Sequence, residues 1–204
     1  MSTTTPIEAA ADRSSLVRDA HQRARAAHAG QIRNASGGMP YIEHPVAVAT
    51  RLVEQGCGEE VLAAALLHDV VEDTETTVDE LRAEFGDRVA DLVAALSDEE
   101  TIEPYVERKA EHRARVAAAG PEALAIYAAD KLTNVATLRG AYARQGEAVA
   151  AEIKVPLDVR IELWDDDLEM LEAEAPQLAC LVELAAELTR LKADRAAAAP
   201  PAGT

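Results

Sequence analysis

The stretch from Val61 to Val71 is the feature that most limits how this chain can fold. Only His68 and Asp69 are polar in it, and every other residue is Val, Leu or Ala. A helix that is apolar on all sides is buried in a protein core. Burying an ionised aspartate beside a histidine is unfavourable unless a partner group or a cation compensates the charge. The stretch therefore predicts a core helix that carries a polar site into the centre of the protein.

The rest of the chain has helical periodicity almost throughout, and no strand, repeat or linker is evident. Hydrophobic residues make up 49% of the sequence and aromatic residues only 3%, so small aliphatic side chains supply the apolar surface, as suits close helix packing. We therefore expect an all-α fold, a single compact helical bundle. The expected helices are residues 14–28, 45–55, 59–72, 77–86, 87–97, 105–119, 122–138, 158–174 and 176–192.

The length of 204 residues suffices for one sizeable core and is marginal for two domains. We expect one domain over residues 14–195. Residues 1–13 are expected to be a flexible N-terminal tail, and residues 196–204 a disordered C-terminal tail.

The formal net charge of −17 argues against nucleic acid and anionic membranes as partners. A polyanionic small molecule would bind only where a metal or local Arg and Lys side chains reverse the field.

Cys57 and Cys180 lack metal or redox spacing, so no disulfide is expected. No secretory segment or bilayer-length apolar run is evident, and we expect a soluble cytoplasmic protein. The oligomeric state stays open, a homo-oligomer included.

Carboxylates follow His68 and Asp69 at helical spacing. Glu72 lies four residues after His68, and Asp73 lies four residues after Asp69, so the four side chains line one wedge of a helix. Three carboxylates on one wedge repel each other unless a metal or a proton lies among them.

A second mostly apolar segment brings in Asp130, which we expect to face inward. Tyr127, Asn134 and Thr137 share its helical face and could offer an amide and two hydroxyls to a ligand. His44 directly precedes Pro45 at an expected helix start, where the helix dipole favours the neutral imidazole that a metal needs.

Two histidines and two aspartates form a mixed nitrogen and oxygen donor set that suits Mn, Fe, Zn or Mg. Each residue also has a structural interpretation. The His68–Asp69 pair alone could lie on a surface, the acidic wedge could be a solvated helix end, and His44 or Asp130 could cap a helix or form an ion pair. It is much less plausible that all four residues have only structural roles than that any one of them does.

Five segments occur in the order, and close to the spacing, of the hydrolase domain of RelA/SpoT-type enzymes, which is an HD domain. The chain resembles most the stand-alone small alarmone hydrolases, over about residues 16 to 140. The matching segments are His28–Arg33, Pro40–Pro45, His68–Thr74, Phe85–Asp87 and Asp130–Asn134.

The resemblance implies an HD-domain helical bundle and hydrolysis of the 3′-pyrophosphate of (p)ppGpp to GDP or GTP. It implies that Glu72 and Asp73 position and deprotonate the attacking water. It also implies that one Mn²⁺, or another divalent metal, is held by His44, His68, Asp69 and Asp130.

The resemblance further implies contacts with the nucleotide substrate. Arg33 would cover the substrate from its loop, and Asn134 and Thr137 would contact the nucleoside. Tyr41, in the segment before His44, is a further substrate-binding candidate.

The chain departs from the family at two basic positions, which are Asn34 and Tyr127 here, and little matches after about Gly140. Another nucleotide substrate, such as NADPH for a 2′-phosphatase, and a non-catalytic metal-binding sensor therefore remain alternatives. We interpret the basic residues between 108 and 115 and the run Asp165–Asp167 as solvated helix faces.

Overall fold

The computed structural model describes residues 5–99 and 101–198. All regular structure in them is helical, apart from an isolated bridge between Ile32 and Pro40, so the expected all-α fold is confirmed. The helices are α1 (Pro6–Arg13), α2 (Ser15–Ala27), α3 (Glu43–Glu54), α4 (Glu59–Leu67), α5 (Val70–Asp73), α6 (Val78–Phe85), α7 (Asp87–Leu96), α8 (Tyr105–Ala119), α9 (Pro121–Gln145), the 3₁₀ helix η1 (Gly146–Glu152), α10 (Leu157–Glu174) and α11 (Cys180–Ala198).

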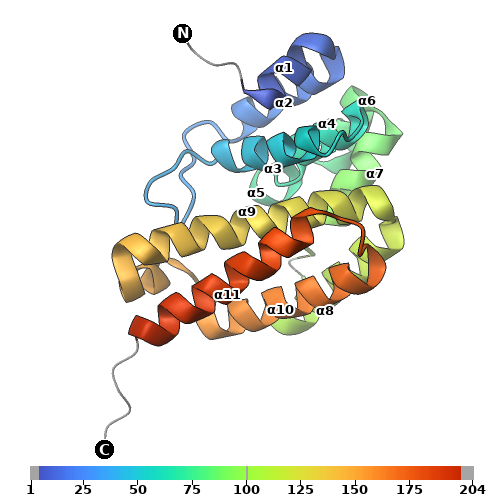
Figure 1. Cartoon of the computed structure of the whole chain (residues 1–204). Coiled ribbons are helices and arrows are strands. Elements are labelled where there is room, and N and C mark those ends of the chain that lie inside the picture. The colour runs from blue at the N-terminus through green and yellow to red at the C-terminus, as the bar shows by residue number, and fades with distance from the viewer. Residues whose placement is uncertain (1–4, 100, 199–204) are drawn as a thin grey trace, which may run out of the picture.

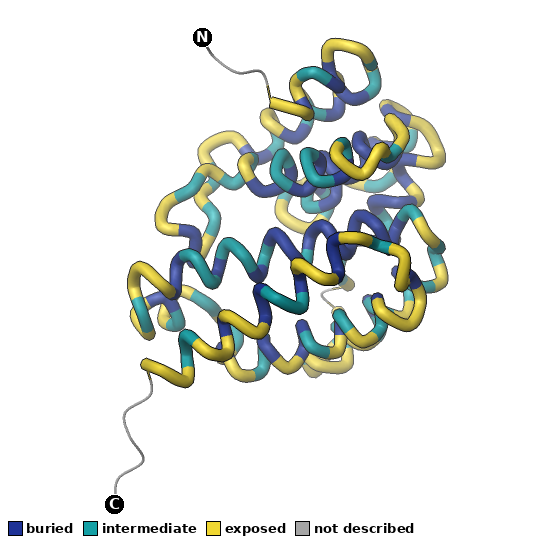
Figure 2. Tube along the Cα trace, in the orientation of Figure 1, coloured by how far each residue is buried: buried dark blue, intermediate teal, exposed yellow. Residues whose placement is uncertain are grey.

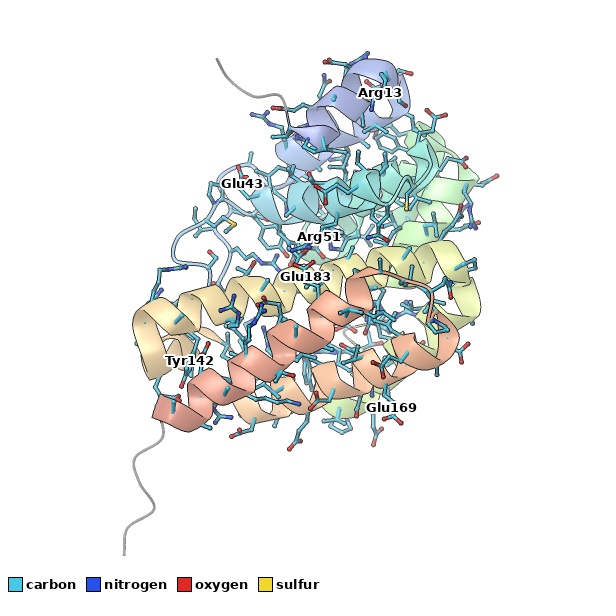
Figure 3. The ribbon with its side chains drawn as sticks, viewed as in Figure 1. Arg13, Glu43, Arg51, Tyr142, Glu169 and Glu183 are labelled. Carbon is cyan, nitrogen blue, oxygen red and sulfur yellow. The ribbon has the colours of Figure 1, made fainter. Side chains whose placement is uncertain are left out.

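Helix α9 runs through the middle of the molecule, with the earlier helices on one side and α8, α10 and α11 on the other (Figure 1). It packs against α3, α4 and α7 on one side and against α8, α10 and α11 on the other. Across these two sides, the half-buried Arg51 of α3 bonds to the exposed Glu183 of α11, with nitrogen and oxygen 3.2 Å apart (Figure 3). Such a surface pair contributes little free energy, so the packing around α9 joins the two sides.

Helix α4 is the core helix that the sequence predicts. All residues from Val61 to Leu67 are buried, and so are residues 123–130 of α9 (Figure 2). The expected helix over residues 59–72 is interrupted, however, because α4 ends at Leu67 and α5 begins at Val70. His68 and Asp69 lie at this break, at the buried end of α4, which places them where other helices converge.

Residues 6–13, which we expected to belong to a flexible tail, form helix α1. Thr5 and Glu8 form a capping box, in which each side chain accepts a hydrogen bond from the other's backbone N–H. Ile7 is fully buried, and α1 packs against α2 and α3. The cap and this one anchoring side chain explain why the segment is ordered. Residues 1–4 lie outside the described residues.

The later helices also differ from the expected bounds. Helix α9 continues seven residues beyond the expected end at Leu138, because the glycine at 140 is tolerated and the helix ends only at Gly146, whose φ is +59°. Helix α11 begins at Cys180 and reaches Ala198, so residues 196–198, expected in the C-terminal tail, are helical. Residues 199–204 lie outside the described residues. No helix in the described part of the chain is long and apolar enough to cross a membrane.

Candidate metal centre and substrate cleft

Three elements bring the predicted metal ligands together. His44 lies in the first turn of α3, His68 and Asp69 lie at the break between α4 and α5, and Asp130 lies in the middle of α9. One ligand atom from each of His44, His68 and Asp130 can be chosen so that all lie within 4.8 Å of one another. Asp69 is not part of that group, but its Oδ1 lies 3.1 Å from Nε2 of His68.

The imidazole of His68 has a defined orientation. Its Nδ1 lies 2.8 Å from the carbonyl oxygen of Ala65, and a carbonyl can only accept, so Nδ1 carries the proton. Nε2 then has a lone pair that faces carboxylate oxygens of Asp69 and Asp130, at 3.1 and 3.7 Å. Nε2 is buried without a hydrogen-bond partner among the described residues. A proton or a cation must therefore lie between this nitrogen and the carboxylates, and a backbone-anchored imidazole is the usual arrangement of a metal ligand.

The electrostatics of the cluster agree with this need for positive charge. Burial lowers the pKa of His68, but Asp69 and Asp130 outweigh it and raise the pKa to about 9. Burial lowers the pKa of His44, whose Nε2 lies 3.0 Å from Asp130 Oδ1. Burial would raise the pKa of Asp130, but Lys131 and the two imidazoles hold it well below the usual range. The cluster therefore offers two imidazoles and ionised carboxylates, and the raised pKa of His68 shows that positive charge is favoured at its Nε2, where a proton or a divalent metal can lie.

Tyr41 and Arg33 enclose the cluster from the side of the loop before α3. The hydroxyl of Tyr41 donates to Asp69 Oδ2 at 2.9 Å, and its ring stacks on His28 with centroids 4.6 Å apart. The guanidinium of Arg33 donates to the Asn134 side chain and lies 3.9 Å from Asp69 Oδ2. Both side chains were predicted from the sequence as substrate contacts, and the structure places both beside the cluster.

Glu72 and Asp73 lie on α5, next to the cluster and exposed to solvent. The pKa of each carboxyl is raised, because the surrounding protein removes part of the water that would solvate its charge. The negative charge of Asp69 raises both pKa values further. Oε2 of Glu72 accepts a hydrogen bond from the backbone N–H of Asp98 at 3.2 Å. This bond holds one candidate base in place while leaving its other oxygen unbonded in the described structure.

The cluster lies in a cleft with two adjoining compartments. The inner compartment contains His44, His68, Asp69 and Asp130, and the outer one contains Thr137 and Lys154. Residues common to both compartments are Arg33, Tyr41, Glu72, Tyr105, Asn134 and Arg160. The two substrate candidates on α9, Asn134 and Thr137, therefore line the cleft.

Cations are concentrated around this cleft in a chain of net charge −17. Its lining residues include Arg33, Arg108, Lys109, Lys131, Lys154 and Arg160. The same lining has six carboxylates, which are Asp69, Glu72, Asp73, Asp130, Glu152 and Asp167. The cleft is therefore close to neutral in a strongly acidic chain, and a bound metal ion would give it the positive field that a polyanionic ligand requires. We had singled out only Arg33 of these cations as a substrate contact.

The basic residues of α8 do not form the solvated face that we expected. Helix α8 packs against α7 and α10, which cover part of this face. Nζ of Lys109 lies 2.8 Å from Asp98 Oδ2 and lines the inner compartment. Arg113 bonds to Asp167, whose Oδ1 lies 3.3 Å from the guanidinium. The expectation failed because charge alone does not show which side of a helix its neighbours cover.

Asp167 is also buried rather than on a surface, with 5% of it exposed. It lies three residues after Trp164 and four before Leu171, both buried, so the apolar stripe of α10 contained the signal that we missed. The hydroxyl of Tyr127 donates to Asp167 at 2.8 Å. We expected Tyr127 to offer its hydroxyl to a ligand. The hydroxyl instead has a protein partner, Asp167.

The fold and the site together define a helical protein with a cluster of histidines and aspartates that could hold a divalent metal, in a cleft between its helices. The chain belongs to the HD domain family, which matches residues 20–155.

Similar proteins share a narrower description. A guanosine-3′,5′-bis(diphosphate) 3′-pyrophosphohydrolase of Aquifex aeolicus is 35% identical over 153 residues, which are 72% of this chain and 22% of that protein. The mouse guanosine-3′,5′-bis(diphosphate) 3′-pyrophosphohydrolase MESH1 is 42% identical over 113 residues, which are 54% of this chain and 63% of that protein. The chain thus spans about a fifth of the first relative and somewhat under two thirds of the second.

A solved structure supports the fold. It is described as a metazoan ortholog of SpoT that hydrolyses ppGpp, and it superposes with a TM-score of 0.71 at 27% identity. The match covers 87% of this chain and 96% of that chain, so it extends beyond the segments that carry the sequence resemblance.

Proposed function

We propose that this chain is a Mn²⁺-dependent hydrolase that removes the 3′-pyrophosphate of (p)ppGpp, giving GDP or GTP and pyrophosphate. The observation that carries the proposal is the buried Nε2 of His68, which has no hydrogen-bond partner among the described residues and faces the carboxylates of Asp69 and Asp130 inside the cleft. The names of the similar proteins supply the substrate.

In this proposal one metal ion per chain is held by His44, His68, Asp69 and Asp130. When bound, the cation polarises a phosphate oxygen and lowers the pKa of water. The tautomer of His68, set by its bond to the Ala65 carbonyl, keeps Nε2 available as a ligand. Tyr41 orients Asp69 by its hydroxyl hydrogen bond, which is the type of second interaction that fixes a ligand's direction.

Glu72 is the proposed general base, with Asp73 positioning the water. A carboxylate with a raised pKa accepts a proton more readily near neutrality than an ordinary one. The water oxygen bonds to the phosphorus attached to the ribose 3′-oxygen, its proton passes to Glu72, and the bond from phosphorus to the 3′-oxygen breaks. The nucleotide then leaves as GDP or GTP, with its 3′-oxygen taking up a proton from solvent, and the water oxygen leaves on the pyrophosphate.

The remaining cleft residues bind the substrate. Arg33 presents a planar set of donors that matches phosphate oxygens, and its bond to Asn134 holds it over the cluster. Asn134 and Thr137 contact the nucleoside in the outer compartment. The cations Arg108, Lys154 and Arg160 compensate for the charges that Asn34 and Tyr127 do not supply.

Purified protein with Mn²⁺ should release pyrophosphate from ppGpp, and chelation of the metal should stop the release. A panel of other nucleotides tests the second candidate, an HD phosphohydrolase with a different substrate, which the Tyr127–Asp167 pairing favours because that position holds no cation. Negligible turnover of ppGpp alongside rapid turnover of another nucleotide would replace the proposal with this candidate. No turnover of anything by metal-loaded protein would favour a non-catalytic metal-binding module.

A further inference from the structure

His112 on α8 is a buried polar side chain that the proposed reaction does not use. It lines the inner compartment, and only 4% of it is exposed. Neither ring nitrogen has a hydrogen-bond partner among the described residues, and both are shielded from solvent. A buried histidine without partners costs folding free energy that an aliphatic residue of similar size would not cost. Such a residue is expected where a ligand completes its hydrogen bonds.

The groups around His112 indicate which ligand this is. Lys109 lies one turn earlier on α8, and Lys131 of α9 lines the same compartment, near enough for its charge to lower the pKa of His112. Each ammonium has three donors, and the described structure uses one from Lys109 on Asp98 and one from Lys131 on Asp130. The ammonium groups therefore keep donors for oxygen atoms that enter the compartment.

The imidazole itself is neutral and carries one N–H. Burial and then the charges of Lys131, Lys109 and Arg115 lower its pKa to about 3, although Asp98 acts in the opposite direction. Nδ1 lies 3.9 Å from Asp98 Oδ1, which is beyond hydrogen-bond distance. The edge of the ring meets the ring of Tyr127, with centroids 5.4 Å apart, and this contact limits how the imidazole can turn.

The position of His112 in the cleft separates it from the nucleoside. It lines the inner compartment only, with the metal ligands, whereas Thr137 lines the outer compartment only. A substrate that places its nucleoside by Thr137 and its reacting 3′-phosphorus at the metal centre would extend the outer phosphate of its 3′-pyrophosphate into the inner compartment. That phosphate and the reacting one leave together as inorganic pyrophosphate, whereas the 5′-phosphates stay on the nucleotide.

We propose that His112, Lys109 and Lys131 form an oxyanion subsite that binds the departing pyrophosphate of the substrate and the free pyrophosphate product. The identity of the anion rests on the proposed function, whereas the subsite itself rests on the unpaired imidazole and the two ammonium groups.

The test compares pyrophosphate binding by the wild-type protein and by His112→Leu, using isothermal titration calorimetry on metal-loaded protein. Metal content is measured before and after each titration. We expect His112→Leu to weaken binding roughly tenfold or more, as for the loss of one hydrogen bond to a charged group. His112→Asn keeps an N–H donor and should retain part of the affinity. His21→Leu, on α2 and outside the cleft, is the matched control and should bind as the wild type does.

Thermal unfolding separates this role from a structural one. A histidine that stabilised the core would lower the unfolding midpoint when replaced, whereas loss of an unpaired imidazole should leave the midpoint unchanged or raise it. Equal pyrophosphate affinity in wild type and His112→Leu, or no binding by the wild type, would overturn the subsite. If pyrophosphate binding depends on His112 but ppGpp is not hydrolysed, the proposed function fails and the subsite stands.

Discussion

Replacing Glu72 by glutamine should remove the general base while leaving its position almost unchanged. Oε2 of Glu72 accepts a hydrogen bond from the backbone N–H of Asp98 at 3.2 Å, and the amide oxygen of glutamine can accept the same bond. Glutamine has nearly the same volume, and Glu72 is not among the proposed metal ligands. The substitution therefore isolates the proton transfer from the shape and the metal content of the site.

Loss of a positioned general base typically lowers the rate about 10²–10⁴-fold, which corresponds to about 3–5 kcal/mol in the activation free energy. We expect Glu72→Gln to lower kcat for pyrophosphate release in this range, with metal content equal to that of the wild type. The measurement is kcat at saturating ppGpp, together with elemental analysis of the protein. Glu75→Gln, an exposed residue on the same acidic stretch that does not line the cleft, is the matched control.

The pH dependence gives a second readout. Glu72 acts as a base only when deprotonated, so activity should rise as pH rises through its pKa, which lies above the ordinary 4.5. This acidic limb should be absent from the residual activity of Glu72→Gln. A kcat within a few-fold of the wild type, or a loss of metal as large as that of a ligand variant, would refute the assignment.

Other substitutions test the remaining roles. Asp69→Ala should reduce the bound metal, measured by elemental analysis, to a small fraction of the wild-type content. Arg33→Met should raise KM about tenfold or more, because a hydrogen bond to a charged phosphate is lost, while metal content stays unchanged. Ile7→Ala should lower the free energy of unfolding by about 2–5 kcal/mol and the unfolding midpoint by roughly 5–15 °C, since this side chain is fully buried. Val106→Ala, half exposed on α8, should change stability by less than about 0.5 kcal/mol. An equal effect of the two apolar substitutions in a denaturation experiment would contradict the anchoring role of α1.

Local patterns predicted the parts of the fold that depend on neighbouring residues along the chain. The apolar stretch that contains His68 predicted the core helix α4, and the expected helix over residues 77–86 corresponds to α6, which begins with a capping box between Thr77 and Glu80. The interruption at Asp69 was missed because it arises where several helices meet and leaves no turn residue in the sequence. Helix α1 was missed because its capping box begins at Thr5, in a stretch that we interpreted only as a tail.

The candidate site was predictable to the extent that its residues occur in recognisable segments. His44, His68 and Asp130 stand in such segments, and the structure brings them together. His112 and Asp167 do not, because their significance comes from contacts between α8, α9 and α10 that no local pattern shows. The apolar stripe of α10 would have indicated that Asp167 is buried, but not that Tyr127 and Arg113 are its partners.

A crystal structure of the protein with Mn²⁺, with anomalous diffraction recorded at the manganese edge, tests most directly that one metal ion joins these distant segments. The account predicts a single anomalous peak per chain, bonded to Nε2 of His44, Nε2 of His68 and a carboxylate oxygen of each of Asp69 and Asp130. A peak bonded elsewhere, or a cleft in which both imidazoles bind no metal at saturating Mn²⁺, would contradict it.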